Sequence, residues 1–169
     1  MRDLQKRRLV VAPLGLTGRR LSIPIAAIAV IVADQVTKTL ALDHLVAYRP
    51  SHVLGPIYLY LTFNSGAAFS LGTGVTPILE AVVVVLIVGL LVFSRHASRS
   101  APFLATVAMG VLLGGALSNL GDRLFRHLPV HGGVVDFIRA VGWFPVFNVA
   151  DSSIVISVIV LVLSWRTGA

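Results

Sequence analysis

The chain has 169 residues, of which 56% are hydrophobic and 12% are charged, and it contains no cysteine. Soluble domains carry about 25% charged residues, so this composition indicates an integral membrane protein, and the missing cysteines exclude disulfides, thiol catalysis and cysteine-ligated metals. The formal net charge is +7, but the basic residues cluster at the ends of apolar segments, where they act as topology signals and do not indicate a nucleic-acid partner.

Residues 1–20 form a basic segment, with six lysines and arginines against one aspartate. We expect a cytoplasmic tail here, followed by one membrane domain in residues 21–169, because the length leaves no room for a separate soluble domain. The pair Arg19-Arg20 before an apolar run also resembles a secretory or twin-arginine signal peptide. No A-x-A cleavage site ends that run, which disfavours this alternative.

Four apolar segments are predicted to cross the membrane as helices. A helix of about 19 residues is about 28 Å long, enough to cross the hydrocarbon core. Four spans put both termini on one side, where nine lysines and arginines lie against five on the other. The positive-inside rule therefore predicts cytoplasmic termini. The segments are approximately Leu21–Leu42, Pro77–Phe93, Pro102–Leu120 and Phe147–Trp165.

Two of these spans carry residues that indicate contacts within the bundle. Asp34 and Lys38 lie four residues apart near the outer end of the first span, so they share a helix face. From the residues alone we favour a local ion pair, with Lys38 extending to the membrane interface. In the third span, Gly110 and Gly114 have the G-x-x-x-G spacing, which predicts close helix packing.

A short extracytoplasmic strand is predicted between the first two spans. Residues 58–63, YLYLTF, are aromatic and β-branched and too short to cross the membrane. Residues 64–69, NSGAAF, follow with a bare backbone on which an extended peptide could pair, although a plain turn has equal weight. The connection 43–56 is expected to be a loop or a short surface helix.

Three aspartates, Asp122, Asp136 and Asp151, organise the stretch 114–153. A carboxylate among apolar residues costs several kcal/mol to keep ionised unless it is paired, wetted or used in chemistry. Asp122 would end the third span, Asp136 would lie in an outer loop and Asp151 about one turn inside the fourth span. We interpret Asp136 and Asp151 as a catalytic pair that shares one proton and supplies a general base and an acid.

Other chemistries fit these residues less well. His127 and His131 are four residues apart, but Pro129 lies between them and no H-E-x-x-H motif occurs, so no metal is predicted. A catalytic Ser-Lys pair is also disfavoured, because no serine lies in a G-x-S-x-G elbow.

The competing class is a small proton-coupled transporter in which intramembrane aspartates form a relay. Its relay would be formed by Asp34, Asp136 and Asp151.

Three amides lie in or near the apolar phase: Asn64, Asn119 and Asn148. Each needs hydrogen-bond partners when it is buried. They either hold the helices together or orient the backbone of a substrate, and the residues alone leave both readings open.

Five motif blocks, taken in order, resemble bacterial lipoprotein signal peptidase, signal peptidase II. They are DQVTK at 34–38, NSGAAF at 64–69, GGALSNLGDRL at 114–124, VVDFI at 134–138 and FNVADS at 147–152. The resemblance implies four transmembrane helices, a small outer β-cradle and a short extracytoplasmic helix. It also implies metal-free cleavage on the amino side of a diacylglyceryl-modified cysteine in prolipoproteins, at the outer face of the bacterial plasma membrane, and we expect a monomer surrounded by membrane lipid.

The resemblance also implies roles for individual residues. Asp136 and Asp151 match the catalytic aspartates of the family. Ser118 and Gly121 depart from its pattern, in which a glycine and a larger apolar residue are expected, and residues 1–20 lie outside it. The residues expected to line the substrate site, or to belong to the motif of the first helix, are Asn64, Gly66, Asn119, Asp122, Arg123, Asn148, Asp34 and Lys38.

Overall fold

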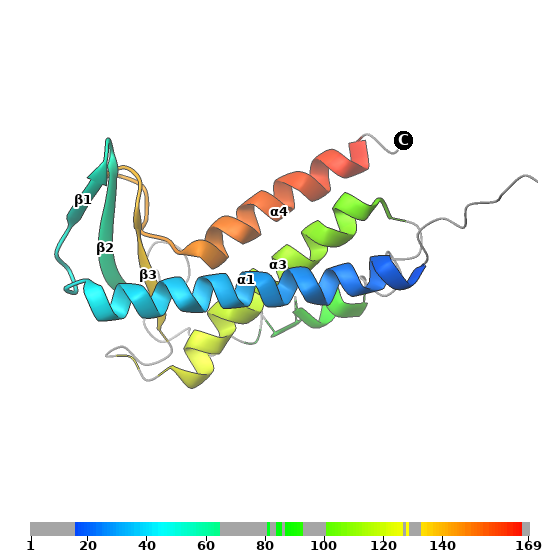
Figure 1. Ribbon diagram of the computed structural model, residues 1–169, viewed down its shortest axis with the longest axis horizontal. Helices are drawn as coiled ribbons and strands as arrows, with labels where there is room; N and C mark the ends of the chain where they lie inside the picture. The colour runs from blue at the N-terminus through cyan, green and yellow to red at the C-terminus, as the bar shows by residue number, and fades with distance from the viewer. Residues whose placement is uncertain are drawn as a thin grey trace, which may run out of the picture.

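The computed structural model describes residues 16–64, 81, 84–85, 87–92, 101–126, 128 and 133–166. Three long helices and a three-stranded antiparallel sheet with the order β1-β2-β3 make up most of these residues (Figure 1). The helices are α1 (Leu16–His44), α3 (Phe103–Phe125) and α4 (Val149–Arg166). The strands are β1 (Ser51–Leu54), β2 (Ile57–Asn64) and β3 (Val134–Arg139).

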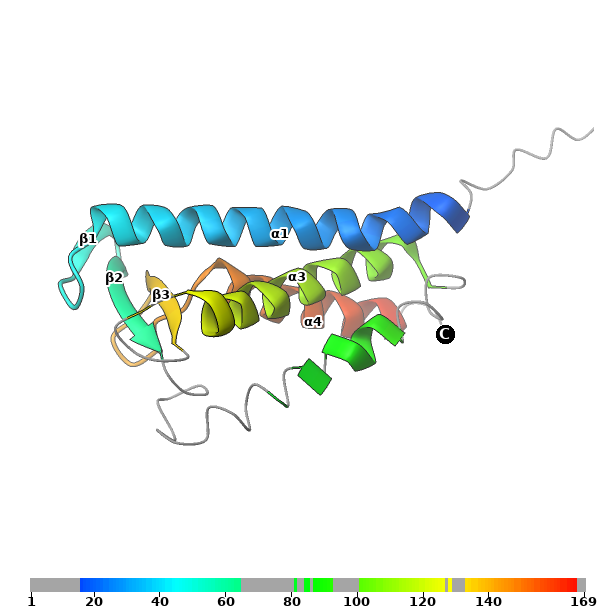
Figure 2. The same cartoon turned by 90° about the horizontal axis from the view of Figure 1, so that it is seen from below.

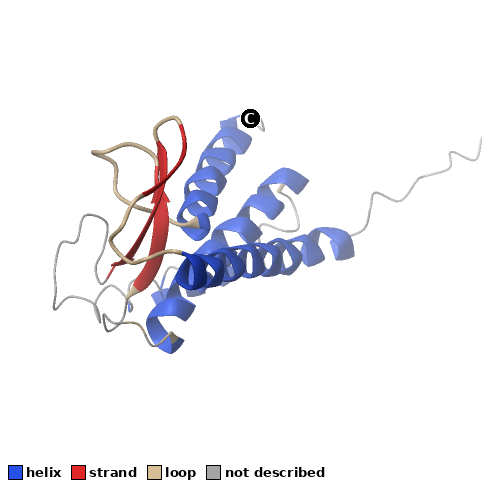
Figure 3. Cartoon of the chain, turned by 60° about the vertical axis from the view of Figure 1, so that its left-hand side comes forward, coloured by secondary structure: helices blue, strands red, loops and turns tan. Residues whose placement is uncertain are grey.

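The sheet lies at one end of the helix bundle. Helices α1 and α3 end next to it and α4 begins next to it, as the two perpendicular views show (Figures 1 and 2). The start of α1 and the end of α4 both lie at the opposite end of the bundle (Figure 1). Residues that are far apart in the sequence therefore meet where the sheet and the helix ends converge (Figure 3).

Glycines on α3 set its distance from the neighbouring helices. A Cβ atom added at Gly114 would lie 2.6 Å from the carbonyl oxygen of Ala27 on α1, and one added at Gly115 would lie 2.7 Å from that of Ala150 on α4. Gly110, one turn earlier, has the same close approach to the backbone of Ile23. The close packing predicted from the G-x-x-x-G spacing is confirmed, because no larger residue fits between these backbones.

The bundle has apolar side chains outside and charged side chains inside. A stripe along α1 leaves its large hydrophobic residues 51% to 64% exposed, whereas Asp34 and Lys38 on the same helix are fully buried. Lipid covers such a stripe in a membrane protein, and buried ionisable groups in these segments are rare unless they are paired. The stripe consists of Leu21, Ile25, Ile28, Val32, Val36 and Leu40.

Two of the described helices are long and apolar enough to cross a membrane by length and composition, Leu21–His44 and Phe103–Phe125. Val149–Ser164 is apolar but shorter. Most of the predicted span Pro77–Phe93 lies outside the described residues, although residues 87–92 are helical. The predicted helical bundle with a small sheet is confirmed, and the count of four spans stays a prediction.

Several predicted boundaries differ from the structure. The strand predicted at 58–63 is confirmed within β2, but the connection before it contains β1, because its residues pair antiparallel with β2. Helix α3 continues to Phe125, so Asp122 lies in its last turns and does not end it. Asp136 lies on β3 and not in a loop, because its neighbours complete the ladder with β2.

Candidate active site

Asp136 is held by the pairing of β2 with β3. In this register Asp136 lies opposite Thr62, and Asn64 lies two residues further along β2 on the same face. The Asn64 side chain donates from Nδ2 to Oδ2 of Asp136 at 3.1 Å. Asp136 is buried, so the sheet presents a nearly dry carboxyl group with one amide aimed at it.

Asp151 is held by the cap of α4. Asn148 is the N-cap residue, and its Oδ1 accepts the backbone N–H of Asp151 at 2.8 Å. In return, Oδ2 of Asp151 accepts the backbone N–H of Asn148 at 3.1 Å. This reciprocal pair has the geometry of a capping box, with Asn and Asp in place of the commoner residues. It fixes Asp151 in the first turn of α4, as its position in the sequence predicts.

Asn148 links the two carboxyl groups directly. While its backbone contacts Asp151, its side-chain Nδ2 donates to Oδ1 of Asp136 at 2.7 Å. A short antiparallel bridge between Ile138 and Phe147 places Asn148 beside β3. The structure therefore brings the two aspartates of the predicted pair together through one residue, although their sequence positions lie on different elements.

The environment of Asp136 favours its neutral form. Burial and, after it, the nearby negative charge of Asp151 raise the pKa of Asp136 to about 7, against hydrogen bonds from Asn64 and Asn148 that lower it. Two carboxyl groups this close do not both ionise easily at neutral pH. The pair can therefore hold one proton between its members, which is what acid–base catalysis requires.

A buried lysine, Lys38, lies near both carboxyl groups of the pair. The ammonium group of Lys38 contacts Oδ2 of Asp34 at 2.7 Å and Oδ2 of Asp122 at 2.9 Å. It also donates to Oδ1 of Asn119 at 2.8 Å. The ion pair with Asp34 is present as predicted, but Lys38 does not extend to the interface, because two carboxylates and an amide hold it inside the bundle.

Two residues in this cluster were not among the predicted site residues. Arg126 donates from Nε to Oδ1 of Asp122 at 2.8 Å and also donates to the side-chain oxygen of Gln35. Gln35 donates from Nε2 to Asp122 at 3.0 Å. The four-residue spacing between Asp122 and Arg126 was the available signal, since it puts both on one helix face.

Ser118, which departs from the family pattern, also joins the cluster. Its hydroxyl donates to Oδ2 of Asp34 at 2.7 Å. It accepts a hydrogen bond from Gln35 at 3.0 Å. The departure is therefore accommodated by an additional hydrogen bond. In the described part of the chain, no buried side-chain nitrogen or oxygen lacks a partner.

The structure brings together most of the site residues expected from the sequence. Arg123 lies on α3, half-buried. Gly66, His127 and His131 lie outside the described residues. Within the ranges that are described, no group of three histidine, cysteine, aspartate or glutamate side chains is arranged to hold a metal ion. The residues brought together are Asn64, Asn119, Asn148, Asp34, Lys38, Asp122, Asp136 and Asp151.

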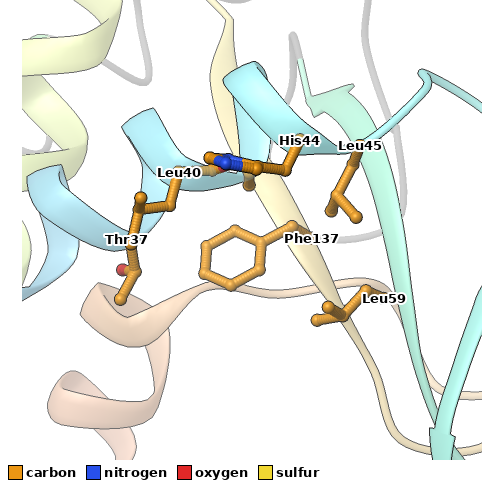
Figure 4. A pocket seen from close by; sticks show the side chains of 7 residues that line it. Thr37, Leu40, His44, Leu45, Leu59 and Phe137 are labelled. Carbon is orange, nitrogen blue, oxygen red and sulfur yellow. The ribbon is translucent and has the colours of Figure 1, made fainter.

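An apolar cleft of about 390 Å³ lies on the other side of β3. Phe137 projects into it between side chains of α1 and β2, among them Leu40, His44 and Leu59 (Figure 4). Neighbouring residues on a strand point to opposite faces, so Phe137 and Asp136 face away from each other. This cleft is therefore separate from the carboxyl pair and contributes no chemistry to it.

The fold and the site define a membrane-helix bundle that holds two linked carboxyl groups at the end covered by a small sheet. A sequence model of the family described as Signal peptidase (SPase) II matches residues 26–166. Because this match covers most of the chain, the protein belongs to the signal peptidase II family, a family of proteases. It is an integral membrane protein of the bacterial type, and the transporter alternative is set aside.

Individual relatives agree with this assignment. The chain is 45% identical to the lipoprotein signal peptidase of Rhodococcus jostii (strain RHA1) over 89% of its own length and 75% of that protein. It is 43% identical to the lipoprotein signal peptidase of Mycobacterium avium (strain 104), over 90% and 83% of the two chains. The fold is similar to that of a solved bacterial membrane enzyme, with a TM-score of 0.74 and 28% identity over 88% of each chain.

Proposed function

We propose that the protein is an aspartic endopeptidase that removes signal peptides from diacylglyceryl-modified prolipoproteins, on the amino side of the modified cysteine. The observation that supports the aspartic mechanism is the contact of one residue, Asn148, with both carboxyl groups. Membership of the signal peptidase II family supports the substrate class. Asp136 and Asp151 are the catalytic residues of the proposal.

The proposed mechanism divides one proton between two carboxyl groups. The environment of Asp136 favours its neutral form, so it donates a hydrogen bond to the oxygen of the scissile carbonyl. The ionised Asp151 takes a proton from water, whose oxygen then attacks the carbonyl carbon. When the C–N bond breaks, the leaving amine receives a proton from the pair. The two carboxyl groups then again hold one proton between them.

The half-buried members of the cluster define where the substrate is expected to lie. Asp151, Asn64 and Asn119 are half-buried, whereas Asp136 and Asn148 are buried. The peptide backbone therefore approaches from the side of Asp151, with Asn64 near the carbonyl that Asp136 contacts. Gly66 and Arg123 remain proposed substrate-contact residues on the family resemblance.

The proposed topology places the site at the outer face of the plasma membrane. The start of α1 and the end of α4 lie at the bundle end opposite the sheet (Figure 1), and nine of the 14 lysines and arginines lie in residues 1–20, residues 94–100 and the C-terminal residues. Under the positive-inside rule this arrangement favours cytoplasmic termini. The lipid-modified substrate would reach the carboxyl pair from the outer leaflet.

A cleavage assay tests the proposed function. Purified protein is mixed with a diacylglyceryl-modified precursor peptide, and release of the signal peptide is measured for the wild type, Asp136→Asn, Asp151→Asn and the double variant. Each single variant is expected to lose nearly all cleavage, and the double variant to be little slower, because groups acting as a unit are non-additive. Substantial cleavage by either single variant, or sensitivity to a chelator, would refute the aspartic mechanism.

A further inference from the structure

We infer that Lys38 is a positioning residue for catalysis, which acts through Asn119 to keep Asp151 ionised and aligned as the general base. This inference rests on the proposed function. Lys38 is fully buried, so it acts on the substrate only through other residues. Its three contacts, Asp34, Asp122 and Asn119, come from α1 and α3, while the carboxylate it influences lies on α4.

The first step is the orientation of the Asn119 amide. Its Oδ1 accepts from the Lys38 ammonium at 2.8 Å and from Nδ2 of Asn148 at 3.2 Å. An ammonium group is a donor only, so the oxygen end of the amide must face it. The nitrogen end is thereby turned toward Asp151, where Nδ2 donates to Oδ1 at 2.8 Å. A flipped amide would place its N–H groups against the cation and its oxygen against the carboxylate, and both contacts would be repulsive.

The second step is the effect of this orientation on Asp151. A donor that cannot turn away stabilises a carboxylate and disfavours a protonated carboxyl group. The charged groups that act on Asp151 are Lys38 and Asp34 on α1 and Asp136 on β3. Asp122 on α3 pairs with Lys38 and with Arg126. Among these groups Lys38 is the cation linked to Asp151 through a single side chain.

A second route from Lys38 also reaches the first turn of α4. Asp34, which Lys38 pairs with, accepts the backbone N–H of Ala150 through Oδ1 at 2.8 Å. A carboxylate at a helix N-terminus stabilises it and fixes its position. Lys38 therefore influences both the hydrogen bond to Asp151 and the depth at which α4 begins.

Stability alone does not account for a buried lysine at this position. Replacing a buried ion pair by apolar residues of similar size is often neutral or stabilising, because the desolvation of two charges offsets their attraction. The double variant Lys38→Met with Asp34→Asn removes the cation and one anion together. Asp122 remains paired with Arg126 at 2.8 Å, so this variant is expected to fold.

The test is the pH dependence of kcat/KM for this double variant with the lipid-modified precursor peptide. The acidic limb of its rate profile is expected to move toward higher pH by about one unit, the size of effect produced by the loss of one directed hydrogen bond and a nearby cation. The loss of the Asp34 charge acts in the opposite direction, but its effect on Asp151 is smaller than that of Lys38. One unit below the limb the variant would then be about tenfold slower than the wild type. KM is expected to stay unchanged, because Lys38 does not contact the substrate.

A second variant and a matched control separate positioning from general loosening. Asn119→Leu removes the amide that connects Lys38 to Asp151, while Lys38 keeps its ion pairs with Asp34 and Asp122. It should therefore move the acidic limb in the same direction. Thr106→Ala removes a buried hydroxyl that links α3 to Ser22 of α1 at 3.2 Å, far from the carboxyl pair. It should lower the melting temperature and leave the limb in place.

The outcomes distinguish the inference from the proposed function. If the wild type does not cleave, or if Asp136→Asn or Asp151→Asn does, the proposed function fails. If these behave as expected and both the Lys38 double variant and Asn119→Leu keep the wild-type acidic limb, only the inference is overturned. A limb shift in Thr106→Ala of the same size would also overturn it, because loosening would then explain the effect.

Discussion

Asn148 and Asp151 exchange two hydrogen bonds at the start of α4, each accepting the backbone N–H of the other. The side-chain nitrogen of the same Asn148 donates to Asp136. A single residue thus caps the helix and joins the two carboxyl groups. Loss of this residue has two separable consequences, one for stability and one for catalysis.

Two substitutions at Asn148 should separate these consequences. Asn148→Ala removes the cap and the link, so we expect a loss of about 1 kcal/mol in the free energy of unfolding and a large loss of kcat. Asn148→Ser keeps a capping oxygen but its side chain is too short to reach Asp136. It should therefore retain most of the stability and still lose kcat. Melting temperature and initial cleavage rates measure the two effects, and a Ser variant with wild-type kcat would contradict the linking role.

The pH dependence of cleavage should report the proton on Asp136. Burial and the charge of Asp151 raise the pKa of Asp136 to about 7. Below that pH the group is neutral and can donate to the carbonyl; above it both carboxyl groups are ionised and the donor is lost. We expect kcat/KM to fall with rising pH above about 7, by about tenfold per unit, and to fall again at acidic pH where both groups are protonated. A rate that stays constant from pH 6 to 9 would assign the acid to another group.

Two glycines on α3 form a matched pair for testing the packing. A Cβ at Gly114 would lie 2.6 Å from the backbone oxygen of Ala27, whereas nothing lies within 4 Å of one at Gly121. Gly114→Ala should destabilise the bundle by about 1–3 kcal/mol, since the backbones must move apart. Gly121→Ala should stabilise it by about 0.5–1 kcal/mol through helix propensity. Thermal unfolding in detergent measures both, and equal effects would show that the close approach is not rigid.

The carboxyl pair could be predicted from the sequence because each aspartate interrupts an apolar run, and apolar surroundings make an unpaired charge costly. The strand β2 and the packing of Gly114 also followed from local patterns. The buried position of Lys38 did not follow from such a pattern. A lysine near the end of an apolar segment normally extends to the interface, and only the approach of Asp122 and Asn119 from another helix provides it with partners inside.

The boundaries that the sequence did not predict depend on tertiary contacts in the same way. Asp136 was expected in a loop because glycine and arginine flank its segment, but pairing with β2 makes that segment a strand. The role of Arg126 depends on its contact with Gln35 on a helix that is distant in sequence. Spacing along one helix shows which residues share a face, and it does not show what that face meets.

The lipid on the substrate should contribute to cleavage through positioning. The apolar stripe of α1 is exposed up to Leu40, near the helix end that lies beside the sheet, so an acyl chain left in the bilayer would hold the scissile bond at the depth of the carboxyl pair. Confinement of this kind replaces a search in three dimensions. Two acyl chains anchor firmly where one anchors only marginally. We therefore expect a precursor peptide without the diacylglyceryl group to be cleaved slower by orders of magnitude. The measurement is a matched pair of peptides with identical sequence, with and without the lipid, in the same detergent. Equal rates on both would leave the aspartic mechanism in place and remove the lipid from recognition.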